Sequence, residues 1–265
     1  MLIVKDLQYR ISPLLSLQDI SFDAAAGELL VILGANGAGK STLLKLITGS
    51  LKADAGEIVI NGKTPEQWTT EERARISAVM QQQNQLQLPF RVQEVVMMGR
   101  YPHFKKYAST QDESIVIAVL EETGITHLKE RNYLTLSGGE QQRVHLARVM
   151  AQIGDTDTKA VRYLFMDEPS NNLDIRHQHA ALNLAQQFAR KGNCVIAVLH
   201  DLNLALQYAD KVLLLKNGRL QGFGLPGAVM TDHIISDAYG LPLQIFNHPA
   251  CHHPIVMPAN HTINN

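Results

Sequence analysis

The sequence predicts an α/β fold in which a parallel sheet forms the core, with an antiparallel β subdomain and a helical insertion. Three short apolar runs, at 29–33, 163–166 and 194–199, have the length and residue types of strands that are buried on both faces. Glycine, acidic residues or histidine follow these runs directly. In open α/β sheets, ligands bind at the carboxyl ends of the strands. We therefore expect the three strand ends to face one shared site.

Two turn signals predict the antiparallel strands. The segments 57–63 and 211–221 each contain an Asn-Gly dipeptide. These two residues adopt the left-handed backbone conformation that a two-residue hairpin turn requires. We therefore expect a β-hairpin in each segment.

The helical insertion is predicted from the stretch between 93 and 152. This stretch shows helical periodicity at 114–122 and 140–150, and it contains no run typical of a buried strand. These signals divide the chain into three parts. We expect an α/β core with its β subdomain at 1–82 and 157–222, a helical subdomain at 83–156 and a proline-rich C-terminal appendage at 223–265.

The composition is that of a globular protein with balanced charge. The chain has 265 residues, of which 45% are hydrophobic and 18% charged, and 24 Lys and Arg residues against 25 Asp and Glu residues leave a net charge of −1. A protein that neutralises nucleic-acid phosphates is usually basic, so we do not expect nucleic acid as a partner. The two cysteines cannot form a disulfide framework, and we expect neither a signal peptide nor a membrane-spanning run.

The strongest motif is Gly34-x-x-x-x-Gly39-Lys40-Ser41, which lies between the first apolar run and a predicted helix at 42–47. This context is typical of a phosphate-binding loop and predicts a P-loop NTPase (RecA-like) core that binds ATP. Backbone N–H groups and the helix N-terminus would bind phosphate oxygens, Lys40 would bind the β- and γ-phosphates, and Ser41 would bind Mg²⁺. The candidate nucleotide-binding residues of this segment are Gly34, Ala35, Asn36, Gly37, Ala38, Gly39, Lys40, Ser41 and Thr42.

An acidic pair ends the second apolar run. Asp167 stands at the expected end of that strand, where it can hold Mg²⁺, and Glu168 follows it. Glu168 can orient or deprotonate the attacking water, which makes it a candidate general base. An exposed acidic pair that caps the next element is the alternative, and the phosphate loop argues against it.

The segment 136–142 contains Ser-Gly-Gly-Glu and lies between the phosphate loop and the acidic strand. With this segment included, the sequence resembles the ATP-binding subunits of ABC transporters. Five motifs occur in the order typical of that family: the phosphate loop, this signature, the acidic strand, a D-loop at 170–174 and a switch histidine, His200. The resemblance covers roughly residues 2–222. It implies a head-to-tail dimer in which the signature of one subunit contacts the ATP held by the other. The signature residues expected to do so are Ser137, Gly138, Gly139 and Glu140.

The resemblance also implies roles for other residues. His200 is expected to hydrogen-bond the γ-phosphate and to fix the water beside Glu168, and both are taken as catalytic. Gln81 aligns best with the Q-loop glutamine, a ligand of Mg²⁺ and water, with a shift of one residue as the alternative. Family members usually stack the adenine on an aromatic side chain near the first strand. Ile11 aligns there and Tyr9 precedes it by two residues, so aliphatic packing and packing on Tyr9 both stay open.

The cargo is indicated only by segments outside these motifs. The segments 95–102 and 173–178 resemble importers of iron chelates, and the polar stretch 154–159 and the tail resemble haem importers most. The resemblance therefore implies haem import driven by ATP and Mg²⁺, with a ferric siderophore or cobalamin as alternatives. It implies a peripheral protein on the cytoplasmic face of the bacterial inner membrane, bound to two permease subunits and served indirectly by a periplasmic substrate-binding protein. Residues 81 to about 106 should form the groove that receives a permease helix.

Three other interpretations have less support in the sequence. A soluble ABC-type ATPase that acts on DNA or ribosomes usually has two cassettes or a long coiled coil, and neither is visible in this sequence. A regulator that binds nucleotide without hydrolysis is opposed by Glu168 and His200. Histidines 248, 252, 253 and 261 beside Cys251 could bind metal or haem iron, but their spacing fits no compact ligand pattern, so we expect solvated surface residues.

Overall fold

The computed structural model describes residues 1–81, 86–154, 160–169, 174–247, 249 and 253–259. The strands are β1 (Leu2–Ser12), β2 (Leu15–Ala24), β3 (Leu29–Leu33), β4 (Ala55–Ile60), β5 (Ser77–Met80), β6 (Tyr163–Asp167), β7 (Cys194–Val198), β8 (Lys211–Lys216), β9 (Arg219–Gly224), β10 (Leu243–Phe246) and β11 (Ile255–Pro258). The α-helices are α1 (Lys40–Ile47), α2 (Thr70–Ile76), α3 (Val92–Met98), α4 (Thr110–Glu122), α5 (Gly138–Gln152), α6 (Ile175–Arg190), α7 (Leu202–Tyr208), α8 (Pro226–Val229) and α9 (Asp232–Tyr239). Short 3₁₀ helices are η1 (Pro65–Gln67), η2 (Tyr101–His103), η3 (Thr126–Leu128) and η4 (Tyr133–Thr135).

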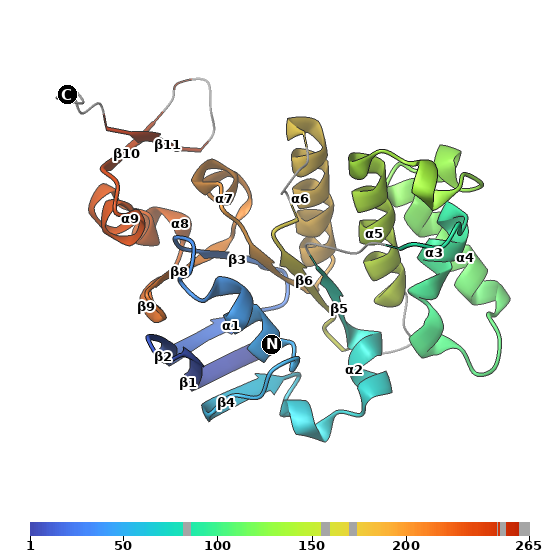
Figure 1. Ribbon diagram of the computed structural model, residues 1–265, viewed down its shortest axis with the longest axis horizontal. Helices are drawn as coiled ribbons and strands as arrows, with labels where there is room; N and C mark the ends of the chain where they lie inside the picture. The colour runs from blue at the N-terminus through green and yellow to red at the C-terminus, as the bar shows by residue number, and fades with distance from the viewer. Residues whose placement is uncertain (82–85, 155–159, 170–173, 248, 250–252, 260–265) are drawn as a thin grey trace.

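Nine of the described strands form one sheet, in which their order is β4-β1-β2-β9-β8-β3-β7-β6-β5 (Figure 1). The strands β8, β3, β7, β6 and β5 run parallel to one another. The strands β4, β1 and β2 pair antiparallel beside them, and β8 pairs antiparallel with β9. The predicted fold class, a parallel core with an antiparallel β subdomain and a helical insertion, is confirmed.

Burial on both faces explains why the core strands are continuous apolar runs. Every residue of β3 is fully buried. The side chains of Leu29, Val31 and Leu33 join one hydrophobic cluster with α5, α6 and α7, and those of Leu30 and Ile32 join a second cluster with α1, β1 and β2. Parallel strands covered on both faces need apolar residues at every position.

One of the two predicted hairpins forms. Asn217 and Gly218 have φ angles of 48° and 77° between β8 and β9, as a type I′ turn requires. The hairpin predicted at 57–63 is confirmed only at its turn, where Asn61 and Gly62 have φ angles of 50° and 79° and Ile60 and Lys63 exchange backbone hydrogen bonds of 2.8 and 3.1 Å. β4 pairs with β1, and Lys63 makes only an isolated bridge to Ile60. The chain turns into η1 at Pro65, whose nitrogen has no hydrogen to donate to a second strand.

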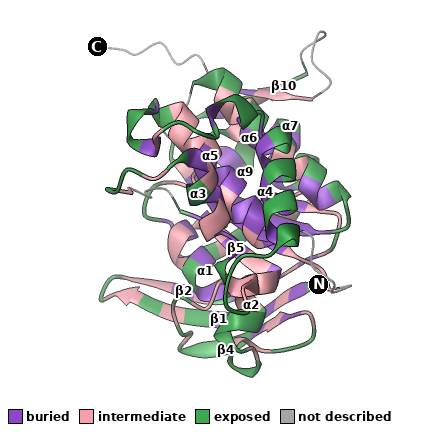
Figure 2. Ribbon diagram, turned by 90° about the vertical axis from the view of Figure 1, so that its right-hand side faces the viewer, coloured by how far each residue is buried: buried purple, intermediate pink, exposed green. Residues whose placement is uncertain are grey.

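The helical insertion lies at one end of the sheet, next to β5 (Figure 1). Its helices α3, α4 and α5 pack on one another and expose their outer faces, while buried residues gather between them (Figure 2). The predicted helices at 114–122 and 140–150 are confirmed as parts of α4 and α5. In the described part of the chain, no helix is long and apolar enough to cross a membrane.

The C-terminal appendage contains more regular secondary structure than its proline content indicates. It contains α8, α9 and the two-stranded sheet of β10 and β11, none of which the sequence predicted. The expected boundary at 222–223 falls inside β9, and the boundaries at 82–83 and 156–157 touch residues outside the described ranges. We therefore keep the three-part division as a proposal and place the start of the appendage at residue 225.

Candidate active site

The phosphate loop joins β3 to α1, as predicted. Gly34 has a φ of 147°, and a Cβ there would lie 2.4 Å from the carbonyl oxygen of Leu215, so only glycine fits. The ammonium of Lys40 donates hydrogen bonds to the carbonyl oxygens of Gly34, at 2.8 Å, and of Ala35, at 3.1 Å. Burial lowers the pKa of Lys40, although the carboxylates of Glu168 and Asp167 partly oppose this shift. The loop thus holds a cation at its centre.

A pocket of about 220 Å³ opens over this loop. Its walls come from the loop, the start of α1, the β1–β2 turn and the ends of β6 and β7. The residues that line it are Ile11, Leu15, Asn36, Gly37, Ala38, Gly39, Lys40, Ser41, Thr42, Glu168 and His200. The structure therefore brings most of the predicted phosphate-loop residues together with both predicted catalytic residues.

The predicted magnesium ligands lie at the carboxyl edge of β5 and β6. The Ser41 hydroxyl donates a hydrogen bond of 3.0 Å to Oδ1 of Asp167. Met80 of β5 is in register with Met166 of β6, so Gln81 and Asp167 follow at the same edge of the sheet. Burial raises the pKa of Asp167, and the hydrogen bond from Ser41 opposes that shift. Hydroxyl, carboxylate and amide oxygens are donors that suit Mg²⁺.

Glu168 and His200 are in direct contact. Nε2 of His200 is hydrogen-bonded to Oε1 of Glu168, and both side chains line the pocket over the phosphate loop. Glu168 has a φ of 52°, which is strained for a residue with a side chain. Its backbone N–H donates to the carbonyl oxygen of Val198, at 3.2 Å, and this bond helps to hold the strained backbone. The carboxylate is therefore oriented by its own backbone conformation and by His200, which lies just beyond the end of β7.

The signature residues form the N-terminus of α5. Ser137 caps the helix: its backbone N–H and hydroxyl donate to Oε2 of Glu140, at 2.8 and 2.9 Å, and its Oγ accepts from the Glu140 N–H at 3.4 Å. These bonds from Ser137 lower the pKa of Glu140. Within the described residues, the pocket over the phosphate loop is lined by none of Ser137, Gly138, Gly139 and Glu140.

Two side chains that the sequence analysis did not single out connect the signature helix to the rest of the site. Nε2 of Gln142 donates to the carbonyl oxygen of Pro169, at 2.8 Å, directly after Glu168. Gly139 faces His177 of α6 so closely that a Cβ would lie 3.2 Å from Nδ1 of that histidine. The repeated glutamines after the signature are the sequence signal that could have indicated Gln142.

The structure favours the aliphatic alternative for the adenine. Ile11 and Leu15 line the pocket and Tyr9 does not, although Tyr9 and Ile11 both pack against the cluster between the β subdomain and α1. Leu15 was not expected, because it lies beyond the first strand and across the turn into β2.

Several predicted features lie outside the described residues. These are positions 170–173 of the D-loop, the polar stretch 155–159, and His248, Cys251, His252 and His261 of the tail. Asp174 is described and caps α6 by accepting a hydrogen bond of 2.9 Å from the His177 N–H. Nδ1 of His253 lies 3.0 Å from the Pro254 carbonyl oxygen.

Comparison with known proteins places this site among related ones. The sequence matches the family described as ABC transporter over residues 17–171. It is 45% identical over 242 residues to the "Hemin import ATP-binding protein HmuV" of Gloeobacter violaceus, covering 91% of this chain and 88% of that protein. It is 42% identical over 257 residues to the protein of the same name from Deinococcus radiodurans, covering 97% of each.

Solved structures agree with the fold. An inward-facing ABC transporter of the metal-chelate type superposes with a TM-score of 0.82 at 26% identity, covering 98% of each chain. The cbiO1 subunit of the cbiONQ ABC transporter complex from Clostridium perfringens superposes with a TM-score of 0.74 at 28% identity, covering 89% of this chain and 92% of that one.

Proposed function

Because the chain belongs to the ABC transporter family, as an ATP-binding and ATP-hydrolysing subunit, we propose that it powers the import of haem through a separate membrane permease. The hydrolytic part of the proposal rests on the single pocket that joins the phosphate loop to Glu168 and His200. The haem part rests on the identity of 42–45% to proteins named for hemin import, which extends over nearly the whole chain. Import of a ferric siderophore or cobalamin is the alternative, which the resemblance to a transporter of the metal-chelate type leaves open.

Binding of ATP is assigned to the phosphate loop, Gly34 to Thr42. The nucleotide would lie in the pocket over the loop, with its adenine against Ile11 and Leu15. Lys40 now bonds to carbonyl oxygens of its own loop, and it would turn its ammonium to the β- and γ-phosphates. The N-terminus of α1 adds its positive end to the same site.

Ser41, Asp167 and Gln81 would hold Mg²⁺. The contact between the Ser41 hydroxyl and the Asp167 carboxylate supports this assignment, because two oxygen donors already converge there at 3.0 Å. When bound, the ion neutralises charge that develops on the β- and γ-phosphate oxygens. Asp167 must be ionised for this role; burial raises its pKa, and the Ser41 hydrogen bond opposes that shift in part.

Hydrolysis is assigned to Glu168 and His200. The carboxylate of Glu168 would orient the attacking water and accept its proton. His200 would hold the Glu168 side chain, which it contacts, and hydrogen-bond the γ-phosphate. Catalysis is then mostly positioning and charge stabilisation, as in other phosphoryl transfers.

The active unit would be a head-to-tail dimer. Ser137 to Glu140 stand at a helix N-terminus, which favours an anion, yet they do not line this subunit's own phosphate-loop pocket. A second copy that faces this one would bring its nucleotide to that helix end. The contacts of Gln142 with Pro169 and of Gly139 with His177 would connect this interface to the residue after the general base.

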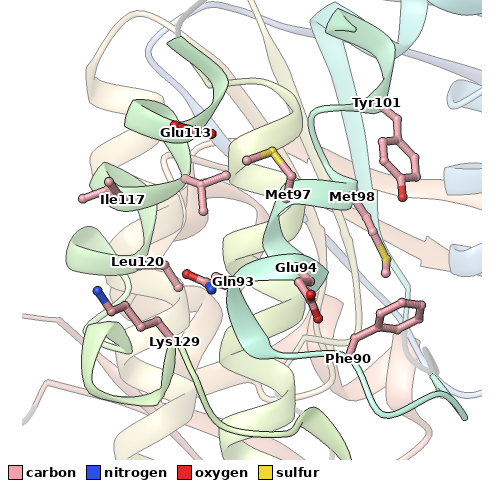
Figure 3. Close-up of a pocket in the computed structure, with 11 residues that line it drawn as sticks. Phe90, Gln93, Glu94, Met97, Met98, Tyr101, Glu113, Ile117, Leu120 and Lys129 are labelled. Atoms are coloured by element: carbon pink, nitrogen blue, oxygen red, sulfur yellow. The ribbon is translucent and has the colours of Figure 1, made fainter. Parts of the chain in front are cut away.

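A groove of about 600 Å³ between α3 and α4 supports the docking of a permease helix (Figure 3). The predicted segment supplies one wall, and α4 supplies the second wall, which the sequence analysis missed. The groove is lined by Phe90, Gln93, Glu94, Met97, Met98, Tyr101, Glu113, Val116, Ile117, Leu120 and Lys129. Its methionine, leucine, isoleucine and phenylalanine side chains suit the apolar face of a helix, and Glu94, Glu113 and Lys129 suit charged residues beside that face.

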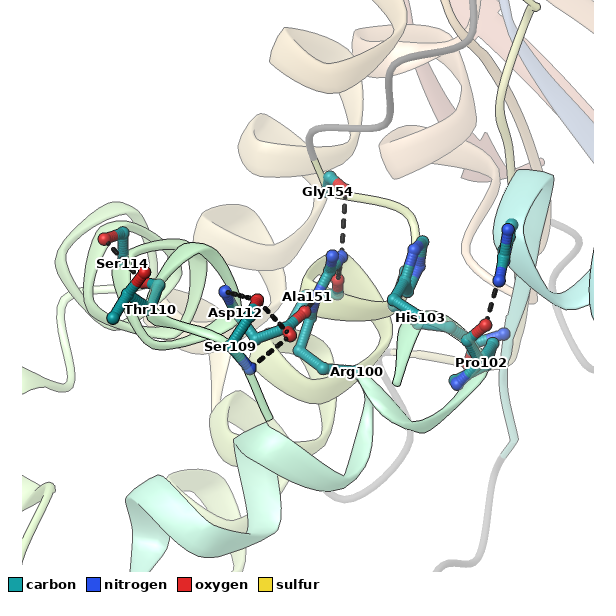
Figure 4. A network of polar contacts seen from close by, with 11 residues as sticks. Arg100, Pro102, His103, Ser109, Thr110, Asp112, Ser114, Ala151 and Gly154 are labelled. Atoms are coloured by element: carbon teal, nitrogen blue, oxygen red, sulfur yellow. Dashed lines mark hydrogen bonds and ion pairs between the residues drawn. The ribbon is translucent and has the colours of Figure 1, made fainter. Parts of the chain in front are cut away.

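A buried ion pair holds the two walls of this groove together (Figure 4). Nε of Arg100, next to η2, donates to Oδ1 of Asp112 in α4, at 2.9 Å, and only 3% of each residue is exposed. Nη1 of Arg100 also donates to the carbonyl oxygens of Ala151 and Gly154 at the end of α5, at 2.7 and 3.0 Å. Since α5 begins at the signature, the groove and the signature would move as one body when the dimer closes and opens.

The chain would act as a peripheral protein on the cytoplasmic face of a bacterial inner membrane. Two copies would bind two permease subunits, and the periplasmic substrate-binding protein would reach them only through the permease. Nucleic acid is not proposed as a partner, because the net charge of −1 offers no excess of cations for phosphates.

The test is the ATPase activity of the complex purified from membranes through a tag on this chain. The complex is reconstituted with its binding protein, which is loaded in turn with haem, a ferric siderophore or cobalamin. Stimulation by haem alone would support the proposal. Stimulation by another ligand would keep the mechanism and overturn the cargo, and purification without a permease would overturn the importer.

A groove variant adds a test of the docking site. Ile117 is 56% exposed on the α4 wall, so Ile117→Asp should fold normally and abolish capture of the permease. Met257→Asp is the matched control, because Met257 is 50% exposed on β11, at the far side of the molecule from α4 (Figure 1). Equal capture of the permease by both variants would contradict docking at this groove.

A further inference from the structure

The C-terminal appendage is packed into the core, and the proposed function gives it no role. Val229, Met230, Ile235 and Ala238 are at most 5% exposed and belong to the same hydrophobic cluster as β3 and β7. α9 contacts β8, and β11 contacts α7 (Figure 1). A segment buried to this degree is a fixed part of the molecule, so its contacts act on the elements that they touch.

One side chain of the appendage reaches the base of the phosphate loop. The hydroxyl oxygen of Tyr239, the last residue of α9, accepts a hydrogen bond of 3.2 Å from the backbone N–H of Gly34. Gly34 is the first residue after β3 and is confined by the Leu215 carbonyl oxygen. This N–H is directed at Tyr239, and Gly34 is not among the residues that line the nucleotide pocket. The hydroxyl therefore holds the point at which the strand becomes the loop.

The same side chain lies beside the switch region. Burial raises the pKa of Tyr239 to about 12; the Gly34 hydrogen bond opposes this shift, and the nearby Asp201 carboxylate adds a smaller upward effect. Asp201 directly follows His200 and caps α7 through hydrogen bonds from the N–H groups of Asn203 and Leu204, at 2.7 and 3.2 Å. The tyrosine is thus a neutral hydroxyl between the phosphate loop and the start of α7.

Two further contacts fix the appendage at this place. Oδ1 of Asn203 accepts from the backbone N–H of Val256 in β11, at 2.7 Å, and Nδ2 of Asn203 lies 3.3 Å from the Val256 carbonyl oxygen. Asp237 of α9 binds Lys216 and Gln221 of the β8–β9 hairpin, at 2.6 and 2.9 Å. The appendage is therefore attached on both sides of Tyr239.

We propose that Tyr239 is a positioning residue of the nucleotide site, through which the C-terminal appendage holds the phosphate loop in its binding conformation. The proposal rests on the proposed ATP-binding function and adds to it a residue outside every motif of the core. Loss of the hydroxyl leaves the Gly34 N–H without its acceptor and releases the base of the loop. The loop then has to be ordered when nucleotide binds, so nucleotide affinity falls.

The experiment compares Tyr239→Phe with wild type in the full chain. Binding of a fluorescent ATP analogue and steady-state turnover are measured at a temperature at which circular dichroism shows both proteins folded. We expect the Kd of the analogue and the KM for ATP to rise about threefold to tenfold, with kcat at saturating ATP close to wild type.

The matched control is Tyr163→Phe. The Tyr163 hydroxyl is also held by one hydrogen bond, of 2.8 Å to Oδ1 of Asn61, at the end of β6 opposite to Asp167. This control should lose stability without a change in Kd or KM.

The outcomes distinguish the positioning role of Tyr239 from the proposed ATP-binding function. An unchanged Kd in Tyr239→Phe, or an equal rise in both variants, would overturn the positioning role. Failure of wild type to bind the analogue would overturn the proposed ATP-binding function instead, and the positioning role would fall with it.

Discussion

The ion pair between Arg100 and Asp112 is buried in the helical subdomain, and a single isosteric substitution removes its negative charge (Figure 4). In Asp112→Asn the guanidinium loses its counter-charge. The side-chain amide also has one acceptor oxygen, whereas the carboxylate accepts from Arg100 on Oδ1 and from the N–H and hydroxyl of Ser109 on Oδ2. One buried donor is therefore left without its present acceptor.

The magnitude follows from these contacts. Removal of one partner of a buried ion pair costs about 3–5 kcal/mol. Arg100 keeps the carbonyl oxygens of Ala151 and Gly154, so we expect the lower end, about 3 kcal/mol. In a protein of this size, 1 kcal/mol changes the melting temperature by about 2–4 °C, so Asp112→Asn should melt about 6–12 °C lower.

The assay is thermal unfolding followed by circular dichroism. The control is Glu113→Gln, which removes an exposed carboxylate at the next position and should change stability by less than about 0.5 kcal/mol. The double variant Arg100→Met/Asp112→Leu should recover part of the loss, because it leaves no unpaired buried charge. A melting temperature of Asp112→Asn within the range of the control would refute the reasoning.

The pH dependence supplies a further check on the same pair. Burial raises the pKa of Asp112, but the hydrogen bonds from Ser109 and Arg100 outweigh burial and leave the pKa below its ordinary value. A carboxylate with a lowered folded-state pKa contributes stability above its unfolded pKa of about 3.9, and this contribution is lost as the pH falls through the folded value. The difference in melting temperature between wild type and Asp112→Asn should therefore be full at neutral pH and narrow below about pH 4.

Two further predictions concern the dimer. Glu168→Gln should abolish phosphate release while ATP still holds two copies together in gel filtration, because the general base is lost and the phosphate contacts stay; turnover at the wild-type rate would rule out the role of Glu168. Ser137→Ala should cost about 1 kcal/mol through loss of the α5 cap and should also lower turnover, without weakening ATP binding to a single subunit. Ser109→Ala, which removes the same type of cap from α4, is the control for stability and should keep full turnover, so equal activity of the two variants would contradict contact of the signature with the partner's nucleotide.

The local motifs could be predicted because their chemistry depends on short spacings. The phosphate loop follows β3 directly, and Asp167 and Glu168 stand at the end of β6. Because the carboxyl ends of parallel strands meet at one edge, a parallel sheet brings them to the same edge. The Asn-Gly signal predicted the hairpin at 217–218 correctly, and β8 and β9 flank it there. At 61–62 the tight turn forms but no second strand follows it, because Pro65 comes soon after and has no N–H for pairing.

Contacts between segments distant in sequence could not be predicted in this way. The groove is formed by α3 and α4 together, and Arg100 bonds to Asp112 in α4. The sequence around each of these residues indicates only a helix or a loop and does not indicate the contact. The presence of Ile11 and Leu15 in the pocket depends on how the β1–β2 turn folds over the phosphate loop. Such arrangements depend on packing among several elements, which no single periodicity records.

The sequence by itself determined the α/β class, the phosphate loop and the acidic strand end, since each is encoded in a continuous segment whose backbone and chemistry are local. Only the tertiary structure decided that Tyr239 meets Gly34, 205 residues away in the chain, and that the appendage is part of the core. The physical reason is that a hydrogen bond between distant residues depends on where burial places their elements, and burial is a property of the whole fold.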